Sequence, residues 1–380
     1  MYFPPQLIQS VFMLPNASYS APSTPYSFVA IHTKSTAKIY LHDIECYDFA
    51  NDFTACIHYE DPTRIPGTIV SSPNDIFTTN ECFQDSTWNL ARIQKIDNSH
   101  QNTYGVDTSV KPVDVYVVDS YVEITHPEFQ GRASLGFKTV QGSKNQHGTH
   151  VASTIAGYTY GVAKKANIIS VQVLDDNGLG QWSNLLAGLS YISKREQNNS
   201  KSVVVNMSIG GSKSDVIEKA IDILVQQGII VVVAAGNSAK NACDTSPAGS
   251  KSAITVGSTS PSDSFSKFSN FGKCVDILAP GEYIKAAVPG GYGVMSGTSM
   301  AAPHVSGAIA NHIGKLMSLK TMPHCVINYL TSTSTRDYIT GVSEETPNKF
   351  LFAHDLQFCK KSPAEIWLNK FVFPLGIFQQ

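Results

Sequence analysis

Three residues of the sequence, Asp119, His147 and Ser299, have the side-chain types that nucleophilic catalysis needs. A serine hydroxyl is a weak nucleophile until a base removes its proton, and an imidazole base needs a carboxylate to fix its tautomer and stabilise its charged form. The three residues supply one group for each role. Together they could transfer an acyl group to a serine.

Each of these residues also has a structural interpretation. Asp119 ends a predicted strand at 113–118, where an aspartate often serves a turn. A lone histidine at a helix start, such as His147, is more often structural, and Ser299 taken alone could be only an N-cap. The chain order Asp, His, Ser is not the Ser, Asp, His order of the α/β-hydrolases, and the Ser299 context lacks the final glycine of a G-x-S-x-G elbow. An esterase of that fold is therefore disfavoured.

The segment around Ser299 predicts a sharp turn followed by a helix. Gly297 and Thr298 allow the turn, and 299–319 is rich in Ala, Ile and Leu at helical spacing. A helix N-terminus offers free N–H groups and a positive dipole end to an oxygen that becomes negative. Pro303 is expected in the first turn, where amides have no intrahelical partner. His150, the second histidine after 146, is expected to be structural.

From residue 88 onward, strands and helices alternate. Continuous Val and Ile runs indicate strands covered on both faces, so we expect a three-layer αβα sandwich with a mostly parallel central sheet and a site beyond the strand carboxyl ends. Strands are predicted at 113–118, 168–174, 203–207, 229–234 and 253–256, and helices at 147–158, 183–196, 215–227 and 299–319.

Length and composition exclude several classes of protein. The chain has 380 residues, 42% of them hydrophobic and 15% charged, which is typical of a globular protein. The net charge of −2 and the lack of a basic run give no sign of a nucleic-acid partner, and no apolar run is long enough to span a membrane. The seven cysteines are too widely spaced for a CxxC metal site.

Two regions flank the alternating part. Residues 1–80 carry short alternating runs such as 27–31 and 37–41, which indicate a small α+β unit, and 78–86 is typical of a linker. The first residues make a poor signal peptide, because the apolar run at 6–14 lacks a basic region before it. We expect residues 358–380 to be a separate tail of unknown role.

Several motifs together resemble the subtilisin-like serine proteases, whose catalytic residues follow the chain order Asp, His, Ser. The resemblance is closest to the proteinase K subfamily and covers 86–357. Three active-site motifs carry it: Val117-Val-Asp119, His147-Gly-Thr-His150 and Ser296-Gly-Thr-Ser-Met-Ala-Ala-Pro-His304. Further matching segments are Trp88-Asn-Leu-Ala-Arg-Ile93, His126-Pro-Glu-Phe-Gln-Gly-Arg-Ala133, Tyr160-Gly-Val-Ala-Lys-Lys165 and Val173-Leu-Asp-Asp-Asn-Gly178.

The resemblance implies a secreted-type serine endopeptidase with Asp119, His147 and Ser299 as catalytic residues. It also implies an oxyanion hole formed by the side chain of Asn237 and the N–H of Ser299. The substrate would be an extended peptide with an apolar or aromatic residue before the scissile bond, read mainly through its backbone. The implied substrate-binding residues are Gly178, Leu179, Gly180, Trp182, Ser208, Ile209, Gly210, Ala234, Ala235 and Gly236.

The same resemblance implies a disulfide between Cys243 and Cys274, for which two free thiols are the alternative. It implies no cofactor for the chemistry, but a structural calcium ion bound by Asp276 with the carbonyls of Lys251 and Ala253. A single carboxylate is a thin signature for calcium.

The resemblance further implies a zymogen with three parts: an inhibitory propeptide at 1–80, a catalytic domain at 81–357 and the tail at 358–380. The propeptide would be cut off by the enzyme near 80–81. The expected partners are protein or peptide substrates and the propeptide, and the expected state is a monomer. The expected location is the secretory pathway, with the protein secreted, at the cell surface or vacuolar.

One departure from the family pattern bears on activity. Where the family has Asp-Thr/Ser-Gly, this chain has Asp119-Ser120-Tyr121. If the glycine serves a backbone angle or close packing, Tyr121 would displace Asp119. The alternative function is therefore a catalytically impaired binding protein of the same fold.

Overall fold

The structure is a computed structural model whose described residues fall into two units. Contacts divide the chain into Met1–Thr78 and Thr79–Gln380. The described residues are 27–29, 44–49, 53–58, 80–83, 85–95, 103–107, 109–199, 201–316 and 322–353. The predicted tail at 358–380 and the run at 37–41 lie outside them.

The first unit contains a small antiparallel sheet. Its strands are β1 (Ser27–Val29), β2 (Ile44–Phe49) and β3 (Phe53–His58), in the order β1-β3-β2. Strand β1 lies within the predicted run at 27–31. The propeptide role of residues 1–80 stays a prediction.

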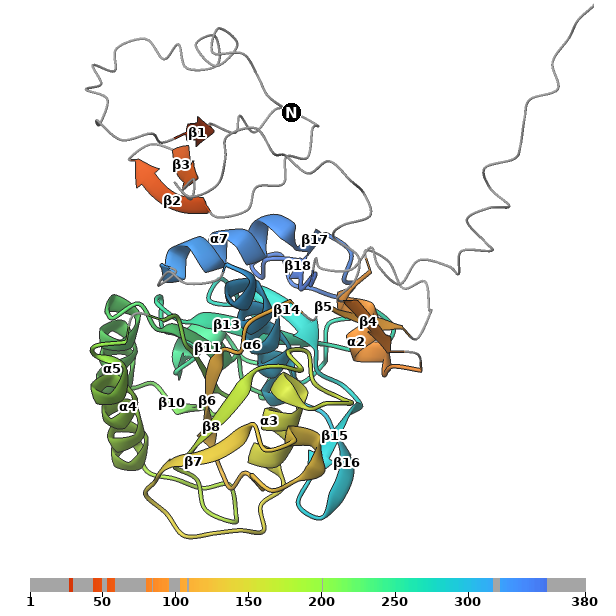
Figure 1. Ribbon diagram of the computed structural model, residues 1–380. Coiled ribbons are helices and arrows are strands. Elements are labelled where there is room, and N and C mark those ends of the chain that lie inside the picture. Colours follow the sequence, from red (N-terminus) through yellow and green to blue (C-terminus); the bar gives the residue numbers. More distant parts are fainter. Residues whose placement is uncertain are drawn as a thin grey trace, which may run out of the picture. The chain divides into compact units, whose positions relative to one another are not determined.

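A nine-stranded sheet is the centre of the second unit (Figure 1). All of its pairings are parallel except the one between β17 and β18. Strand β6, which ends at Asp119, lies between β9 and β8 and is the third strand from the β7 edge of the sheet. In sheet order the strands are β17 (Thr335–Arg336), β18 (Lys349–Phe350), β14 (Ile277–Pro280), β13 (Ile254–Thr259), β11 (Ile230–Ala234), β9 (Val204–Met207), β6 (Asp114–Asp119), β8 (Asn167–Gln172) and β7 (Ala133–Lys138).

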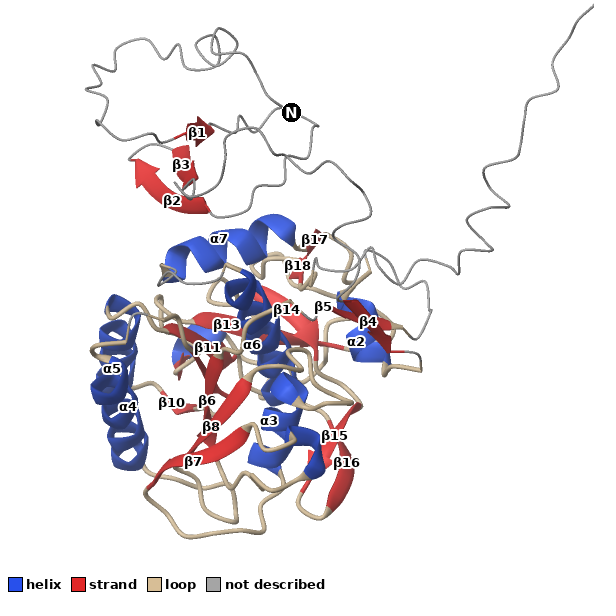
Figure 2. Cartoon of the chain, viewed as in Figure 1, coloured by secondary structure: helices blue, strands red, loops and turns tan. Residues whose placement is uncertain are grey.

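Helices cover both faces of this sheet (Figure 2). Helices α3 (His147–Ala156) and α6 (Thr298–Lys315) pack on one face, and α4 (Trp182–Glu196) and α5 (Asp215–Gln226) pack on the other. Strand β6 shows why: Val115 and Val117 belong to the core under α3 and α6, while Tyr116 and Val118 belong to the core under α4 and α5. The predicted three-layer architecture is confirmed.

Smaller elements surround the three layers. Strand pairs are β4 (Asn80–Phe83) with β5 (Tyr104–Asp107), β10 (Gly211–Ser212) with β12 (Thr245–Ser246), and β15 (Ile284–Val288) with β16 (Gly291–Met295). Short helices are α2 (Trp88–Ile93), η1 (Pro127–Phe129), η2 (Ala242–Asp244) and α7 (Pro323–Thr333). The prediction of a linker over 78–86 is wrong for 80–83, which pair with β5. The helix predicted to reach 319 ends at Lys315, and α7 follows it.

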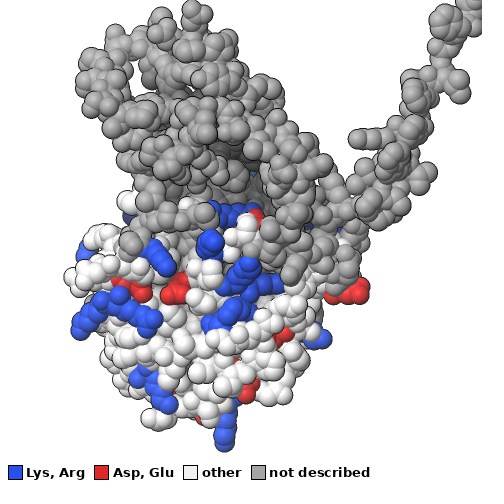
Figure 3. Space-filling model, in the orientation of Figure 1, with Lys and Arg blue, Asp and Glu red and all other residues white. Residues whose placement is uncertain are grey.

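The surface shown in Figure 3 is mostly uncharged over the described residues, with basic and acidic side chains interspersed. Within the described part of the chain, no helix combines the length and the apolar character that crossing a bilayer requires.

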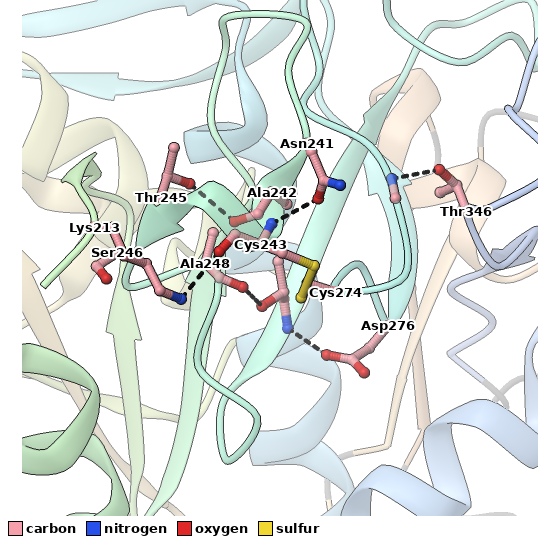
Figure 4. The surroundings of a disulfide bond; sticks show 12 residues. Lys213, Asn241, Ala242, Cys243, Thr245, Ser246, Ala248, Cys274, Asp276 and Thr346 are labelled. Atoms are coloured by element: carbon pink, nitrogen blue, oxygen red, sulfur yellow. Dashed lines mark hydrogen bonds between the residues drawn. A yellow bond between two sulfur atoms is a disulfide. The ribbon is translucent and has the colours of Figure 1, made fainter. Parts of the chain in front are cut away.

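A disulfide joins Cys243 and Cys274, as the resemblance implied. The two Cα atoms lie 5.3 Å apart and the bond closes a loop over a sequence separation of 31 residues. Figure 4 shows the polar contacts around it: Cys243 N donates to Asn241 Oδ1 (2.9 Å), and Lys213 Nζ donates to the Cys243 carbonyl (3.0 Å). The bond therefore ties η2 to the segment before β14.

Removing this disulfide should destabilise the fold. A closed loop of this size restricts the unfolded chain by about 3.5 kcal/mol in the chain-entropy model, so the C243A/C274A variant should lose about that much free energy of unfolding. Guanidinium titration of parent and variant measures the difference. Mass spectrometry of the parent first verifies that the bond is formed. Coincident unfolding transitions of the two proteins would contradict the prediction.

Candidate active site

Asp119 and His147 meet where β6 ends and α3 begins. Asp119 is fully buried, and His147 Nδ1 donates to its Oδ1 at 2.8 Å and its Oδ2 at 3.0 Å. Asp119 Oδ1 also accepts from the backbone N–H of Ser120 at 2.6 Å. These contacts leave His147 Nε2 as the basic nitrogen, as a proton acceptor requires.

The Asp119 carboxylate tunes the basicity of His147. Burial on its own lowers the pKa of His147, but the negative charge and the hydrogen bond of Asp119 outweigh it, so the pKa lies above its usual value. The imidazole is therefore a stronger base than an isolated histidine.

Two side chains that the sequence analysis did not single out position the start of α3. Asn145 Oδ1 accepts from His147 N (2.8 Å) and from Ser120 Oγ (3.0 Å). Ser120 Oγ in turn accepts from Gly148 N at 3.0 Å. These bonds satisfy first-turn amides of α3 and connect them to the residue after Asp119. In the sequence, the position of Asn145 two residues before His147 was the one signal that could have indicated its contact with the start of this helix.

Ser299 lies in the first turn of α6, after the extended N-cap Gly297. Its Oγ donates to the Ser208 carbonyl at 3.2 Å, and Ser208 Oγ donates to the Ser299 carbonyl at 2.8 Å. This reciprocal pair fixes Ser299 against the segment that follows β9.

The predicted position of Pro303 in α6 is wrong, and the hydrogen bond from Ser208 Oγ explains how the helix accepts it. The prediction placed it in the first helical turn, but α6 begins at Thr298, so Pro303 is the sixth residue and lies in the second turn. Proline has no N–H, so the Ser299 carbonyl lacks its usual intrahelical donor. The hydroxyl of Ser208 takes that place, and the helix continues past the proline.

Asn237 follows β11 and lies beside the start of α6. Its Oδ1 accepts from Thr298 N and from Thr298 Oγ1, both at 2.8 Å. Since Oδ1 is occupied, the amide orientation is fixed and Nδ2 remains as the donor. Thr298 Oγ1 also accepts from Gly236 N at 3.0 Å, so one threonine fixes both the loop and the side chain.

A cavity of about 700 Å³ adjoins His147. Trp182 lies over Gly211, where an added Cβ would come within 2.7 Å of its ring. The predicted substrate-binding residues that line the cavity are Gly178, Leu179, Gly180, Trp182, Ser208, Ile209 and Gly210. Gln181 and Gly211, which lie in the same two predicted segments, also line the cavity, and the lining further includes residues that were not predicted: Ser120, Asn145, Val173, Leu174, Leu185 and Ser212.

The segment predicted for the primary pocket does not contribute to this lining. Ala234 ends β11, and both Ala234 and Ala235 are buried. Gly236 is half-buried and has φ +105°, a conformation that favours glycine. The pocket role of Ala234, Ala235 and Gly236 stays a prediction.

Tyr121 does not take a conformation that demands glycine. It lies outside the positive-φ region, and the hydrogen bonds between Asp119 and His147 form beside it. The displacement of Asp119 considered above is absent from the described geometry.

The other two histidines near the site have structural roles. His150 is buried and its Nε2 bonds to the Ile284 carbonyl (2.9 Å), while His304 Nδ1 donates to the Met300 carbonyl (2.8 Å). Burial lowers the pKa of each to about 4, so both stay neutral. The structural interpretation of His150 fits this geometry.

Asp276 is a half-buried carboxylate. Its Oδ2 accepts from Thr255 N at 2.8 Å, and burial raises its pKa to about 6. Among the described residues, no three His, Cys, Asp or Glu side chains cluster as a metal site. This carboxylate would fit a cation if backbone oxygens supplied the other ligands, as predicted for Lys251 and Ala253.

Comparisons with known proteins agree with this geometry. A sequence model described as the Subtilase family matches residues 111–348. The subtilase-type proteinase psp3 of Schizosaccharomyces pombe is 38% identical over 283 residues, which cover 70% of this chain and 62% of that protein. Proteinase T of Parengyodontium album is 39% identical over 282 residues, which cover 72% of this chain and 94% of that protein.

A solved structure agrees as well. The crystal structure of a cold-adapted subtilisin-like serine proteinase matches with a TM-score of 0.67 at 39% identity, covering 72% of this chain and 100% of that one. The matched residues contain Asp119, His147, Asn237 and Ser299. On sequence and structure together, the chain belongs to the subtilase family, the subtilisin-like serine proteases.

Proposed function

We propose that the chain is a serine endopeptidase that hydrolyses peptide bonds through an acyl-enzyme on Ser299. The observation that carries this is the Asp119–His147 pair at the same sheet edge as Ser299, which is bonded to Ser208 in the lining of the His147 cavity. The relatives named as proteinases support the same activity.

The described groups suit each step of the chemistry. The Ser299 hydroxyl turns from the Ser208 carbonyl to His147 Nε2, which takes its proton as Oγ attacks the peptide carbonyl; such hydrogen bonds often tighten only with substrate bound. Ser299 N and Asn237 Nδ2 are the proposed donors to the oxyanion. His147 then gives its proton to the leaving amine, and water repeats the sequence to release the acid.

The proposed substrate is an extended peptide with an apolar or aromatic residue before the scissile bond. The cavity between Gly178–Gly180 and Ser208–Gly210 presents backbone groups on two sides, which suits strand addition and broad specificity. The uncharged segment Ala234-Ala-Gly236 supports an apolar preference.

We also propose that the protein is made as a zymogen with residues 1–80 as inhibitor, and that it acts as a monomer in the secretory pathway. The separate first unit, which ends at Thr78, supports the zymogen, and the Cys243–Cys274 disulfide supports an oxidising compartment.

The alternative is a catalytically impaired protein that binds peptides without cleaving them, with Tyr121 as the cause. A fluorophosphonate probe separates the two. We expect the full chain, but not S299A, to label at Ser299 and to lose about 80 N-terminal residues, a size that follows from the position of the predicted cut. Intact-mass and peptide mass spectrometry measure both events.

A parent that neither labels nor shortens would overturn the endopeptidase proposal for the chain as it stands. Y121G then identifies the cause: labelling regained in that variant would assign the impairment to Tyr121.

The pH dependence should report the Asp119–His147 pair. His147 acts as a base only when neutral, and Asp119 raises its pKa, so kcat/KM should fall on acidification through a pKa above the ordinary value of about 6.5. In D119N burial lowers the pKa without opposition, so the acidic limb should move below that value, with kcat reduced by about 10⁴-fold. Rates on a neutral fluorogenic peptide measure both profiles. An acidic limb at the same pH in both proteins would contradict the assignment.

We further propose that Asp276 contributes to a structural calcium site. Chelation with EDTA should lower the melting temperature of the parent, because a ligand that binds the folded state stabilises it. The D276N variant should be insensitive to EDTA and to added calcium. Equal calcium responses of parent and D276N by calorimetry would remove Asp276 from the site.

A further inference from the structure

Asn270 is a buried side chain with every polar group directed at one loop. Only 1% of it is exposed, and it lies between β13 and β14. Its Nδ2 donates to the Ala235 carbonyl at 2.8 Å, and its Oδ1 accepts from Ser238 N and Lys240 N, both at 3.1 Å. Its backbone N donates to the Gly236 carbonyl at 2.8 Å.

These four bonds bracket Asn237. They reach residues 235 and 236 before it and residues 238 and 240 after it. Asn237 itself is exposed, and its own side chain is oriented from the other side by Thr298. Asn270 thus fixes the 235–240 loop, and Thr298 orients the side-chain amide of Asn237. Both are needed to direct Asn237 Nδ2.

The loop needs such support because its backbone is unusual. Gly236 has φ +105°, and Ala239 has φ 49°, a left-handed conformation that costs energy for a residue with a Cβ. A Cβ added at Gly236 would come within 2.4 Å of Asn270 Nδ2, so loop and amide are in close contact. Strained conformations persist only where surrounding contacts hold them.

The segment that carries Asn270 is itself attached along the loop. Ala239 N donates to the Phe268 carbonyl (2.9 Å), Phe271 N to the Lys240 carbonyl (2.9 Å), and Ala242 N to the Phe271 carbonyl (2.8 Å). The disulfide of Figure 4 closes the far end of this pairing at Cys274. Asn270 therefore projects from a fixed support.

We propose that Asn270 is a positioning residue for transition-state stabilisation: it holds the 235–240 loop so that Asn237 Nδ2 meets the developing oxyanion. The inference rests on the proposed endopeptidase function. The Asn270 side chain bonds to residues 235, 238 and 240 on either side of Asn237, so its effect passes through Asn237. A donor displaced by a fraction of an ångström stabilises the oxyanion less, while the ground-state peptide, bound along the cavity, is held as before.

The test is a double-mutant cycle of N270A, N237A and the double variant. Loss of one oxyanion donor costs about 10²–10³-fold in kcat, so a misplaced donor in N270A should cost about 10–100-fold with KM changed by less than about threefold. If Asn270 acts through Asn237, the double variant should be no slower than N237A. Losses that multiply in the double variant, or an N270A with the kcat of the parent, would overturn the inference.

Asn348 provides the matched control. Its amide likewise bridges a loop, donating to the Ile339 carbonyl at 2.7 Å and accepting from Ile339 N at 3.3 Å. N348A should lose stability without losing kcat. Hydrogen exchange should quicken at the 236–240 amides in N270A and not in N348A.

N270D is the second variant should N270A fail to fold. The carboxylate still accepts from Ser238 N and Lys240 N but cannot donate to the Ala235 carbonyl, so its kcat should fall between the parent and N237A. Failure of both variants to fold would assign Asn270 to the fold and overturn its positioning role. A parent without activity defeats the proposed function and this inference with it, whereas an active parent with unaffected Asn270 variants defeats this inference alone.

Discussion

The buried carboxylate of Asp119 is the constraint on which the active-site half of the molecule depends. Burying a charged group away from water costs free energy unless hydrogen bonds and an opposite charge compensate it. Here the compensation comes from Ser120 N and from His147 Nδ1, so α3 has to begin where β6 ends. The position of β6 between β9 and β8 then brings the ends of several strands to the same edge.

The second requirement is a helix start that is both rigid and open. Pro303 removes one hydrogen bond from α6, and Ser208 replaces it from outside the helix. Ser299 is thereby attached to the segment after β9 by a contact that a regular helix would not leave available. Thr298 does the same for the loop after β11, since its side chain bonds to both Gly236 N and Asn237 Oδ1. The first residues of α6 thus hold two separate segments, the one after β9 and the one after β11.

The sequence predicted the parts of this structure that local pattern controls. The buried strands are runs of apolar residues, so β6, β9 and β11 were placed within a residue or two. Of the motif residues, Asp119 ends β6 and His147 begins α3. Contacts between distant segments were not predictable in this way. Nothing in the local pattern around Ser208 or Asn270 indicates a partner, because their bonds reach 91 and about 30 residues along the chain. Strand β4 was missed for the same reason, since its polar sequence pairs only through β5.

The corner around Tyr121 shows why a family pattern must be interpreted through geometry. Tyr121 replaces a glycine, yet the close approach in this corner is made by Gly148: a Cβ there would lie 2.6 Å from the Ser120 carbonyl oxygen and 2.7 Å from that of Tyr121. The backbone of 120–121 thus packs against the first turn of α3, and the residue that must lack a side chain is on the helix. Thr149 continues the contact, since its Oγ1 accepts from Glu123 N at 2.9 Å. A tyrosine at 121 can therefore coexist with the Asp119–His147 hydrogen bonds, because the close approach in this corner requires the missing side chain at Gly148 and not at 121.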